Sequence, residues 1–332
     1  MLNEKTSEEN PRVVVLLTIF RDPPLLPNIL ECLKQTEYSN FEILFVDCES
    51  TKTRRLIERT RLAMPVHYYH LDEDKGAAYE LNAGIRLAMN IDAKYVVRLE
   101  GDAIPQETDW LQVLVNVLEN DGSVAVAMPF DVNRNGEIGY GGRLYGNGTY
   151  SIFSGSPPSE IVPSLGTGGH CYITRKSYLK ELFDEGIDPY WVPFNISSED
   201  LDFNLKAWLR SYRVVTVGAA RVLHEGTSMP KNLTYRAPYR IYNMYKNRPC
   251  LLMLNFGCRH IFVNIWYRFL NDLYSAALHS EIILMSRGYL WTIANLRKIL
   301  EERRLRKRRW KKVKDTQLRG VVLERLPMPV KR

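Results

Sequence analysis

The feature that most constrains this chain is a regular alternation of two patterns over its first 130 residues. Short, β-branched apolar runs, typical of buried strands, are separated by longer segments with apolar residues at helical spacing. Such alternation predicts a parallel sheet with helices on both faces. The expected strands cover 12–18, 41–47, 66–71, 95–99 and 124–129, and the expected helices cover 24–35, 51–62, 77–89 and 110–118.

The pattern changes beyond residue 130. Residues 133–156 are rich in Gly, Asn and Tyr, which indicates hairpins. A helix is expected over 199–210 and a strand over 213–218, whereas beyond residue 229 helical spacing dominates without a clear strand. No apolar run reaches the ~18–20 uninterrupted residues that a membrane-spanning helix needs. We therefore expect an α/β domain over 11–228, with halves 11–130 and 131–228, and a helical C-terminal extension over 229–332.

Charge and cysteine content narrow the class of protein. The net charge is +7, and residues 297–314 hold eleven basic residues against two acidic ones. This basic tail carries +9, and subtracting +9 from +7 leaves −2, so the rest of the chain is near neutral. The five cysteines form no C-x-x-C pair and are odd in number, which disfavours a zinc site or a disulfide framework and fits a reducing cytoplasm. The first ten residues do not have the pattern of a secretory signal.

Carboxylates stand where two of the expected strands end. Asp47 closes the 41–47 run, and Glu100 and Asp102 follow the 95–99 run on either side of Gly101. Ligands of such sheets bind at the carboxyl ends of the strands. Carboxylates placed there can ligate hard cations, hydrogen-bond a base or a sugar, and act as general bases. Each of them could instead be a helix cap or a surface acid.

Six segments, in the same order along the chain, resemble the motifs of glycosyltransferase family 2, whose members have the GT-A fold. Residues 13–20 resemble the opening strand, 43–50 the strand that ends in a base-binding carboxylate, 75–84 the helix beside the donor, and 95–105 the strand with the D-x-D motif. Residues 168–175 resemble the glycine-rich acceptor segment, and 187–200 the segment that ends in the catalytic base. The resemblance implies that these residues bind the nucleotide sugar: Thr18, Phe20, Asp47, Gly76, Asn82, Glu100, Gly101 and Asp102.

The resemblance also implies an activity, inverting transfer of a sugar from a nucleotide diphosphate donor to an acceptor hydroxyl. Asp102 and His224, with Glu100, would hold Mn²⁺ or Mg²⁺, and Asp200 would be the general base, with Glu199 as the alternative. Residues 11–130 would form the nucleotide-binding half and 131–228 the acceptor half. The nucleotide would be UDP, dTDP or GDP, and one aromatic residue with Asp47 suits a pyrimidine better. The acceptor-side residues would be Gly169, His170, Asp188 and Trp191, with ordinary core packing as the alternative for His170 and Trp191.

The sequence departs from the family pattern at a few positions. Glu100 replaces the usual first Asp of the D-x-D motif, Cys48 and Glu49 replace an Asp-Gly or Asn-Gly pair, and Leu81 replaces an Arg. These departures keep open the alternative of a non-catalytic GT-A-like nucleotide-binding or scaffold protein. A nucleotidyltransferase is disfavoured, because residues 20–23 replace the glycine-rich loop that such enzymes carry after the first strand.

The C-terminal third suggests where the acceptor is found. Residues 242–248 resemble a segment of rhamnosyltransferase-like members of the family. The basic tail predicts attachment to an anionic membrane surface, each basic residue contributing about 1 kcal/mol, so we expect a cytoplasmic protein peripheral to the inner face of the membrane. A solvated surface helix is the alternative, and specific nucleic-acid binding is disfavoured because no nucleic-acid-binding fold accompanies the tail. The acceptor would then be a glycan or a lipid-linked saccharide, as in polysaccharide biosynthesis.

Overall fold

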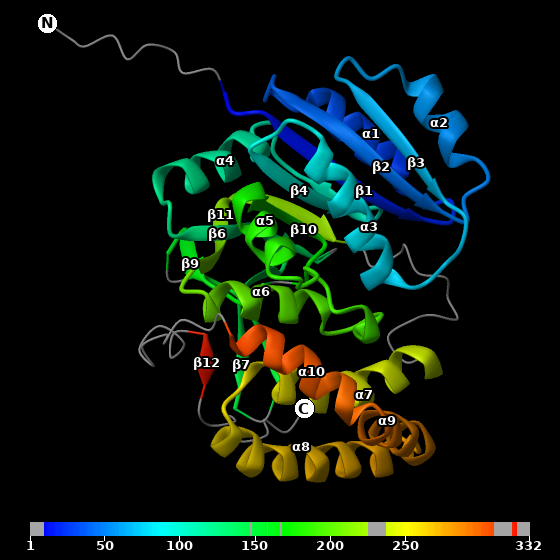
Figure 1. Cartoon of the computed structure of the whole chain (residues 1–332). Coiled ribbons are helices and arrows are strands. Elements are labelled where there is room, and N and C mark those ends of the chain that lie inside the picture. The colour runs from blue at the N-terminus through cyan, green and yellow to red at the C-terminus, as the bar shows by residue number, and fades with distance from the viewer. Residues whose placement is uncertain are drawn as a thin grey trace, which may run out of the picture.

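The computed structural model describes residues 10–133, 135–146, 148–157, 159–166, 168–224, 237–308 and 321–323. Within these ranges one mixed sheet carries helices on both faces, and a group of helices follows it (Figure 1). The strands are β1 (Val13–Phe20), β2 (Phe41–Cys48), β3 (Val66–Leu71), β4 (Tyr95–Glu100), β5 (Ala103–Pro105), β6 (Val124–Val132), β7 (Ile138–Tyr145), β8 (Tyr150–Ser154), β9 (Ile161–Pro163), β10 (Cys171–Arg175), β11 (Arg213–His224) and β12 (Val322–Leu323). The helices are α1 (Leu26–Gln35), α2 (Thr53–Thr60), α3 (Ala77–Asn90), α4 (Trp110–Asn120), α5 (Lys176–Asp184), the 3₁₀ turn η1 (Val192–Phe194), α6 (Glu199–Leu209), α7 (Pro238–Asn255), α8 (Cys258–Leu278), α9 (Ile282–Ala294) and α10 (Leu296–Lys307).

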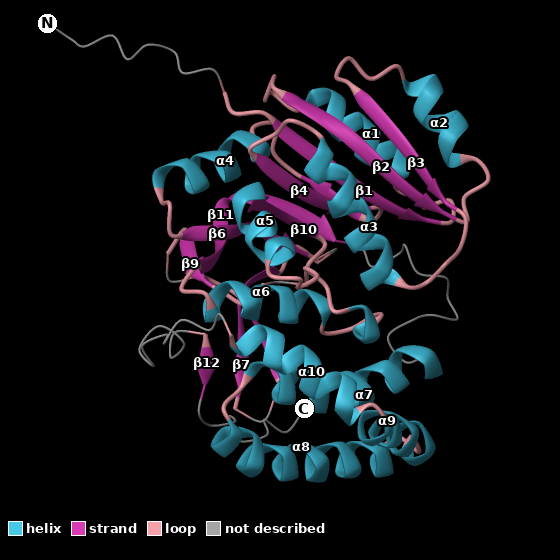
Figure 2. Cartoon of the chain, viewed as in Figure 1, coloured by secondary structure: helices cyan, strands magenta, loops and turns pink. Residues whose placement is uncertain are grey.

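The sheet is parallel where the sequence alternates most regularly. Strands β3, β2, β1 and β4 lie in that order and all pair in parallel. Strand β10 then runs antiparallel between β4 and β6, and β6 pairs in parallel with β11 (Figure 2). The carboxyl ends of β1, β2 and β4 therefore meet at one edge of the sheet.

Period-two patterning in the strands creates two hydrophobic cores, one on each face of the sheet. In β1, Val14 and Leu16 pack with α3, α5 and α6, whereas Val13, Val15 and Leu17 pack with α1 and α4. Because both faces are covered, all five of these side chains have no exposed surface. Strands buried on both faces read as continuous apolar runs, which is the pattern that the sequence shows.

The predicted class, an α/β sheet with helices on both faces followed by C-terminal helices, is confirmed. Several strands differ from the expectation: the short strands β5 and β9 were not predicted, and β12 lies beyond residue 229, where no strand was expected. The five-residue strand β10 was not predicted, and β11 continues to His224 rather than ending near residue 218. The pairing of β11 with β6 shifts register between Val217 and Arg221, so an irregularity at Gly218 interrupts the sequence pattern but not the strand.

Helices α7 to α10 form the lower part of the molecule in Figure 1. Helix α7 packs on α6 and also contacts α8, α9 and α10. In the described part of the chain, no helix has the length and apolar character needed to cross a membrane.

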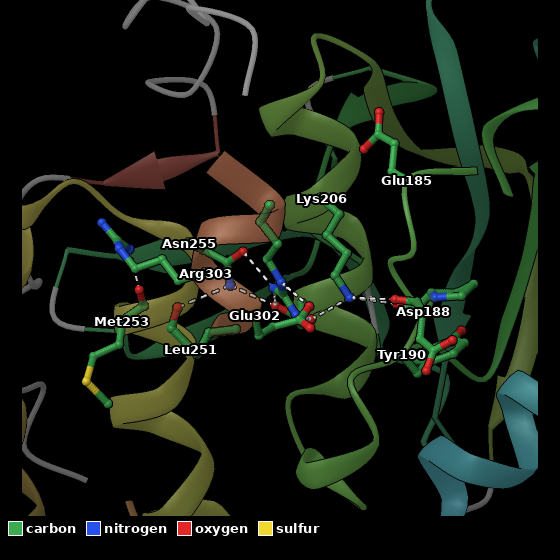
Figure 3. A network of polar contacts seen from close by, with 12 residues as sticks. Glu185, Asp188, Tyr190, Lys206, Leu251, Met253, Asn255, Glu302 and Arg303 are labelled. Carbon is green, nitrogen blue, oxygen red and sulfur yellow. Dashed lines mark hydrogen bonds and ion pairs between the residues drawn. The ribbon is translucent and has the colours of Figure 1, made fainter. Parts of the chain in front are cut away.

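The basic tail expected over 297–314 is partly internal. Residues 296–307 form α10, in which Arg303 and Arg306 are buried. The guanidinium of Arg306 forms two hydrogen bonds with Asp202 of α6, at 2.6 and 3.0 Å. Lys206, at 2.8 Å, and Asn255 of α7, at 2.7 Å, also contact Asp202 (Figure 3). Arg303 and Arg306 therefore contact the protein interior and are not available to the membrane surface that the tail was predicted to bind, and residues 309–314 lie outside the described residues.

Candidate active site

A cavity of about 550 Å³ opens at the carboxyl ends of β1 and β4. A volume in the range of about 300–1,000 Å³ is typical of small-molecule sites. The residues predicted from the sequence that line it are Thr18, Phe20, Gly76, Glu100, Gly101, Asp102, Glu199, Asp200 and His224. Side chains from β1, β4, α6 and β11, separated by as many as 206 positions in the chain, thus meet in one place.

Glu100, Asp102 and His224 form a cluster that could hold a cation. Each offers one ligand atom, and these atoms all lie within 4.8 Å of one another. Glu100 ends β4, Asp102 lies in the turn before β5, and His224 ends β11, which pairs with β5 next to Asp102. Two carboxylate oxygens and one imidazole nitrogen are donors that Mn²⁺ accepts. The cluster faces the cavity, so a cation held there could contact a bound diphosphate.

A second histidine, His170, packs against the ring of His224. The ring of His170 stacks on that of His224, with centroids 3.9 Å apart and planes 13° apart. The Nε2 atom of His170 contacts the carboxylate of Asp131, and His170 is buried. Burial alone would lower the pKa of His170, but Asp131 raises it to about 9. The contacts with Asp131 and His224 therefore orient His170, which does not line the cavity itself.

Glu199 and Asp200 open helix α6 and face the same cavity. Burial raises the pKa of both carboxyl groups, and the neighbouring Asp200 raises that of Glu199 further. A carboxyl group with a raised pKa is a stronger base when ionised, which suits proton abstraction. Gly169 lies directly against Asp200: a Cβ atom on Gly169 would lie 2.6 Å from the Cβ of Asp200, and its φ of +73° also disfavours a side chain.

The loop before α6 has an unusual backbone. Asn195, Ser197 and Ser198 all have positive φ, between 63° and 74°. Such conformations are uncommon for residues other than glycine and persist where the surroundings enforce them. Asn247 of α7 does so by donating hydrogen bonds to the carbonyls of Phe194, at 2.8 Å, and Ile196, at 2.9 Å.

Lys246 donates in the same way to the carbonyl of Pro193, at 2.7 Å. Lys246 and Asn247 belong to residues 242–248, the segment that resembles rhamnosyltransferase-like members. This segment therefore supports the loop that precedes Glu199 and Asp200 of α6.

Six of the predicted site residues do not line the cavity. Asn82 is buried and bonds the backbone of Tyr190 at both its amide oxygen and nitrogen. Asp188 pairs with Arg86, and Trp191 packs edge-on against Phe194. The remaining three are Asp47, Gly169 and His170.

Asp47 lies at the end of β2, as the sequence predicted, but its side chain is fully buried. Its Oδ2 accepts a hydrogen bond from Tyr68, and His70 lies 3.9 Å away. Its Oδ1 has no hydrogen-bond partner among the described residues. The carboxylate thus keeps one acceptor atom unused at the edge of the sheet where ligands bind.

Sequence reasoning missed several residues of the cavity wall. Arg98 lies buried within β4 and forms an ion pair with Glu100. Glu80, near the start of α3, has its pKa raised to about 7 by burial and by Asp74. A charged residue inside the apolar 95–99 run was the signal for Arg98. Glu80 gave no such signal, because a glutamate in the first turn of a helix is ordinary.

The protein thus has an α/β fold in which one cavity contains a set of possible cation ligands, Glu100, Asp102 and His224, and a pair of carboxyl groups, Glu199 and Asp200. The model of the family described as Glycosyl transferase family 2 matches residues 14–183, just over half of the chain. The chain therefore belongs to glycosyl transferase family 2, a family of glycosyltransferases. A comparison with curated proteins gives no match.

Solved structures show the same fold at low identity. Similar chains include GalNAc-T7 with UDP, GalNAc and Mn²⁺, at 15% identity and a TM-score of 0.58, covering 74% of this chain and 48% of that one. The mannosyltransferase PcManGT from Pyrobaculum calidifontis with GDP-Man and Mn²⁺ is 16% identical, with a TM-score of 0.54 and coverage of 90% and 86%. S. aureus TarS 1-349 with UDP-GlcNAc is 17% identical, with a TM-score of 0.54 and coverage of 80% and 73%. The chain thus spans about half of the GalNAc-T7 chain, and these likenesses bear out the expected GT-A fold.

Proposed function

We propose that this chain transfers a sugar from a nucleotide diphosphate donor to an acceptor hydroxyl with inversion at the anomeric carbon. The observation that carries the proposal is the meeting of two groups in one cavity. The Glu100, Asp102 and His224 cluster lies on one part of its wall and the Glu199 and Asp200 pair on another. The first group suits a charged diphosphate and the second suits removal of a proton.

Asp102 and His224, with Glu100, are the residues that would hold the cation. The donor set fits Mn²⁺ or Mg²⁺ through its two carboxylates, and the imidazole favours Mn²⁺. A bound cation would supply positive charge to the leaving diphosphate. GalNAc-T7 and PcManGT were both solved with Mn²⁺, which supports this choice of metal.

Asp200 is the proposed base, with Glu199 as the alternative within the pair. The acceptor oxygen forms a bond to the anomeric carbon while the bond from that carbon to the diphosphate oxygen breaks. The acceptor proton passes to the carboxylate, and the nucleoside diphosphate leaves with the bonding electrons. Attack from the face opposite the leaving group inverts the configuration in one step.

For the donor we propose a pyrimidine nucleotide, UDP or dTDP, ahead of GDP. Thr18 and Phe20 of β1 line the cavity and would contact the base, whereas Asp47 is buried at the end of β2 outside the cavity. The solved relatives bind different donors, UDP-GlcNAc in TarS and GDP-Man in PcManGT, so the hexosyl or rhamnosyl group transferred is a matter for assay. For the acceptor we propose a glycan or a lipid-linked saccharide.

The test uses water as the acceptor, so that the natural acceptor is not needed. A panel of UDP, dTDP and GDP sugars is incubated with the chain and Mn²⁺, and release of the nucleoside diphosphate is followed. Asp200→Asn should lower the rate by about a hundredfold or more. Asp188→Asn, which removes a carboxylate outside the cavity, should leave the rate unchanged. Turnover retained in Asp200→Asn would refute the role of Asp200, and a freshly released sugar with the donor's anomeric configuration would refute inversion.

A further inference from the structure

Helix α8 directs charged side chains toward the protein and apolar side chains toward solvent, which is the reverse of an ordinary surface helix. Its buried residues include Arg268 and Asp272, whereas its exposed residues are mostly aromatic or aliphatic. The inward carboxylate of Asp272 is held by Arg268 at 2.6 Å, by Arg248 of α7 at 2.8 Å and by Tyr289 of α9 at 2.9 Å. Polar groups thus fix α8 to the protein, and its apolar stripe points outward.

The exposed stripe continues onto α9, which packs beside α8 through an edge-on contact of Phe269 with Tyr289. We call the exposed apolar side chains of α8 and α9 the outer face. Of the twenty large apolar residues that are exposed in the described part of the chain, twelve belong to it. Its most prominent members, between 62% and 75% exposed, include Phe262, Trp266, Tyr274, Ile283, Leu290 and Ile293. Contiguous apolar patches of this kind mark interaction sites.

Charges around the outer face indicate what covers it. Within α8 and α9, as described, the exposed charged residues are Arg259 and Arg287, and no acidic residue is exposed. The one acidic residue near the helix junction, Glu281, is partly buried and accepts a hydrogen bond from Tyr245 at 2.8 Å. On the following helix, α10, four basic residues and Glu301 are exposed. The surroundings of the outer face are therefore strongly positive.

We propose that the outer face docks on an anionic lipid surface, with α8 and α9 lying in the plane of the interface. Apolar side chains would enter the boundary between headgroups and acyl chains, where Trp and Tyr are favoured, and the arginines would meet lipid phosphates. A second copy of the chain is a poorer fit, because a symmetric contact would bring the same positive groups face to face. The docking surface is thus mainly the outer face, and the exposed basic residues of α10 add to it.

Helix α7 joins this surface to the cavity. Its first turn contributes Tyr239 and Arg240 to the cavity wall. Farther along, α7 packs closely on α9, where a Cβ atom on Gly288 would lie 2.8 Å from the backbone nitrogen of Lys246. If the proposed function holds, this arrangement suits an acceptor that is carried on a lipid. The docking itself does not rest on the proposed reaction.

The experiment is sedimentation of the full chain with lipid vesicles, without donor or acceptor. One set of vesicles is phosphatidylcholine, and the other contains equal parts of phosphatidylcholine and phosphatidylglycerol. We expect binding to the anionic vesicles, and a fall in affinity of about tenfold or more for the triple variant Trp266→Ser, Tyr274→Ser and Ile283→Ser. The matched control, Val66→Ser, Tyr69→Ser and Ile161→Ser, removes exposed apolar residues elsewhere and should bind as the parent does.

A second variant tests the charges. Arg259→Glu with Arg287→Glu should lower affinity for the anionic vesicles by about tenfold or more. Full binding by the Trp266 triple variant, or no binding of the parent chain to anionic vesicles, would overturn the proposal. A parent chain that binds no vesicle and forms dimers which the triple variant loses would identify a second copy as the occupant. Donor hydrolysis measured on the same variants separates a failure of docking from a failure of the proposed reaction.

Discussion

The ion pair of Arg306 with Asp202 gives a prediction whose size follows from the structure. Both side chains are fully buried, and Asp202 accepts two hydrogen bonds from Arg306. Arg306→Met would leave Asp202 buried with only Lys206 and Asn255 as partners. Removal of one partner from a buried pair costs about 3–5 kcal/mol, because the remaining charge is incompletely compensated. We therefore expect the free energy of unfolding, measured by urea denaturation, to fall by about that amount.

A control and a double variant make this prediction refutable. Arg297→Ala removes an arginine from the same helix, but its pair with Glu301 is exposed, so the loss should stay below about 1 kcal/mol. Adding Asp202→Asn to Arg306→Met leaves the buried Lys206 without a counterion, so the double variant should be less stable than the single one. A loss below about 1 kcal/mol in Arg306→Met, or a double variant at least as stable as the single one, would refute the reasoning.

Four further predictions concern the cavity. Because the pKa of Asp200 is raised, kcat/KM should fall as pH falls through a value above that of a free aspartate, and a pH–rate profile with a limb at the ordinary value would contradict this. Burial raises the pKa of Glu80 from its ordinary value near 4.5 to about 7, so the resulting loss of stability develops as the pH rises between these two values and is complete above about 7; Glu80→Gln should raise the free energy of unfolding at pH 8 by on the order of 2 kcal/mol and have little effect near pH 4. Gly169→Ala should abolish most donor hydrolysis while circular dichroism stays unchanged, since the new Cβ displaces Asp200; unaltered turnover would speak against that contact. His224→Ala should weaken Mn²⁺ binding by about tenfold or more in calorimetry, and equal affinity would remove His224 from the cluster.

The sequence predicted those parts of the fold in which local pattern and tertiary environment agree. Strands β1, β2, β4 and β6 are buried apolar runs between helices, whereas β3 is largely exposed, and the bounds of all five match the expectation closely. Strand β10 could not be predicted in this way, because five residues after a glycine pair carry little periodic signal. Its place between β4 and β6 is decided by pairing with strands far along the chain.

The cavity shows the same division. Glu100, Asp102 and Asp200 lie where strands end or a helix begins, and such positions are readable from pattern and from family resemblance. The pairing of Arg306 with Asp202 is not readable, because the two residues lie 104 positions apart and a cluster of basic residues usually indicates a solvated surface. The outward stripe of α8 is similarly ambiguous, since periodicity gives the apolar face of a helix but not the side on which the protein lies.

The most direct test of the central claim is thermal unfolding of the chain with UDP, dTDP and GDP, each with and without Mn²⁺. A ligand present at about 100 times its dissociation constant adds about 2.7 kcal/mol to the stability of the folded state. We predict that one nucleoside diphosphate raises the Tm only when Mn²⁺ is present, and that Asp102→Asn abolishes this shift. If none of the three nucleotides raises the Tm of the folded chain with Mn²⁺, the proposed nucleotide-sugar site would be contradicted.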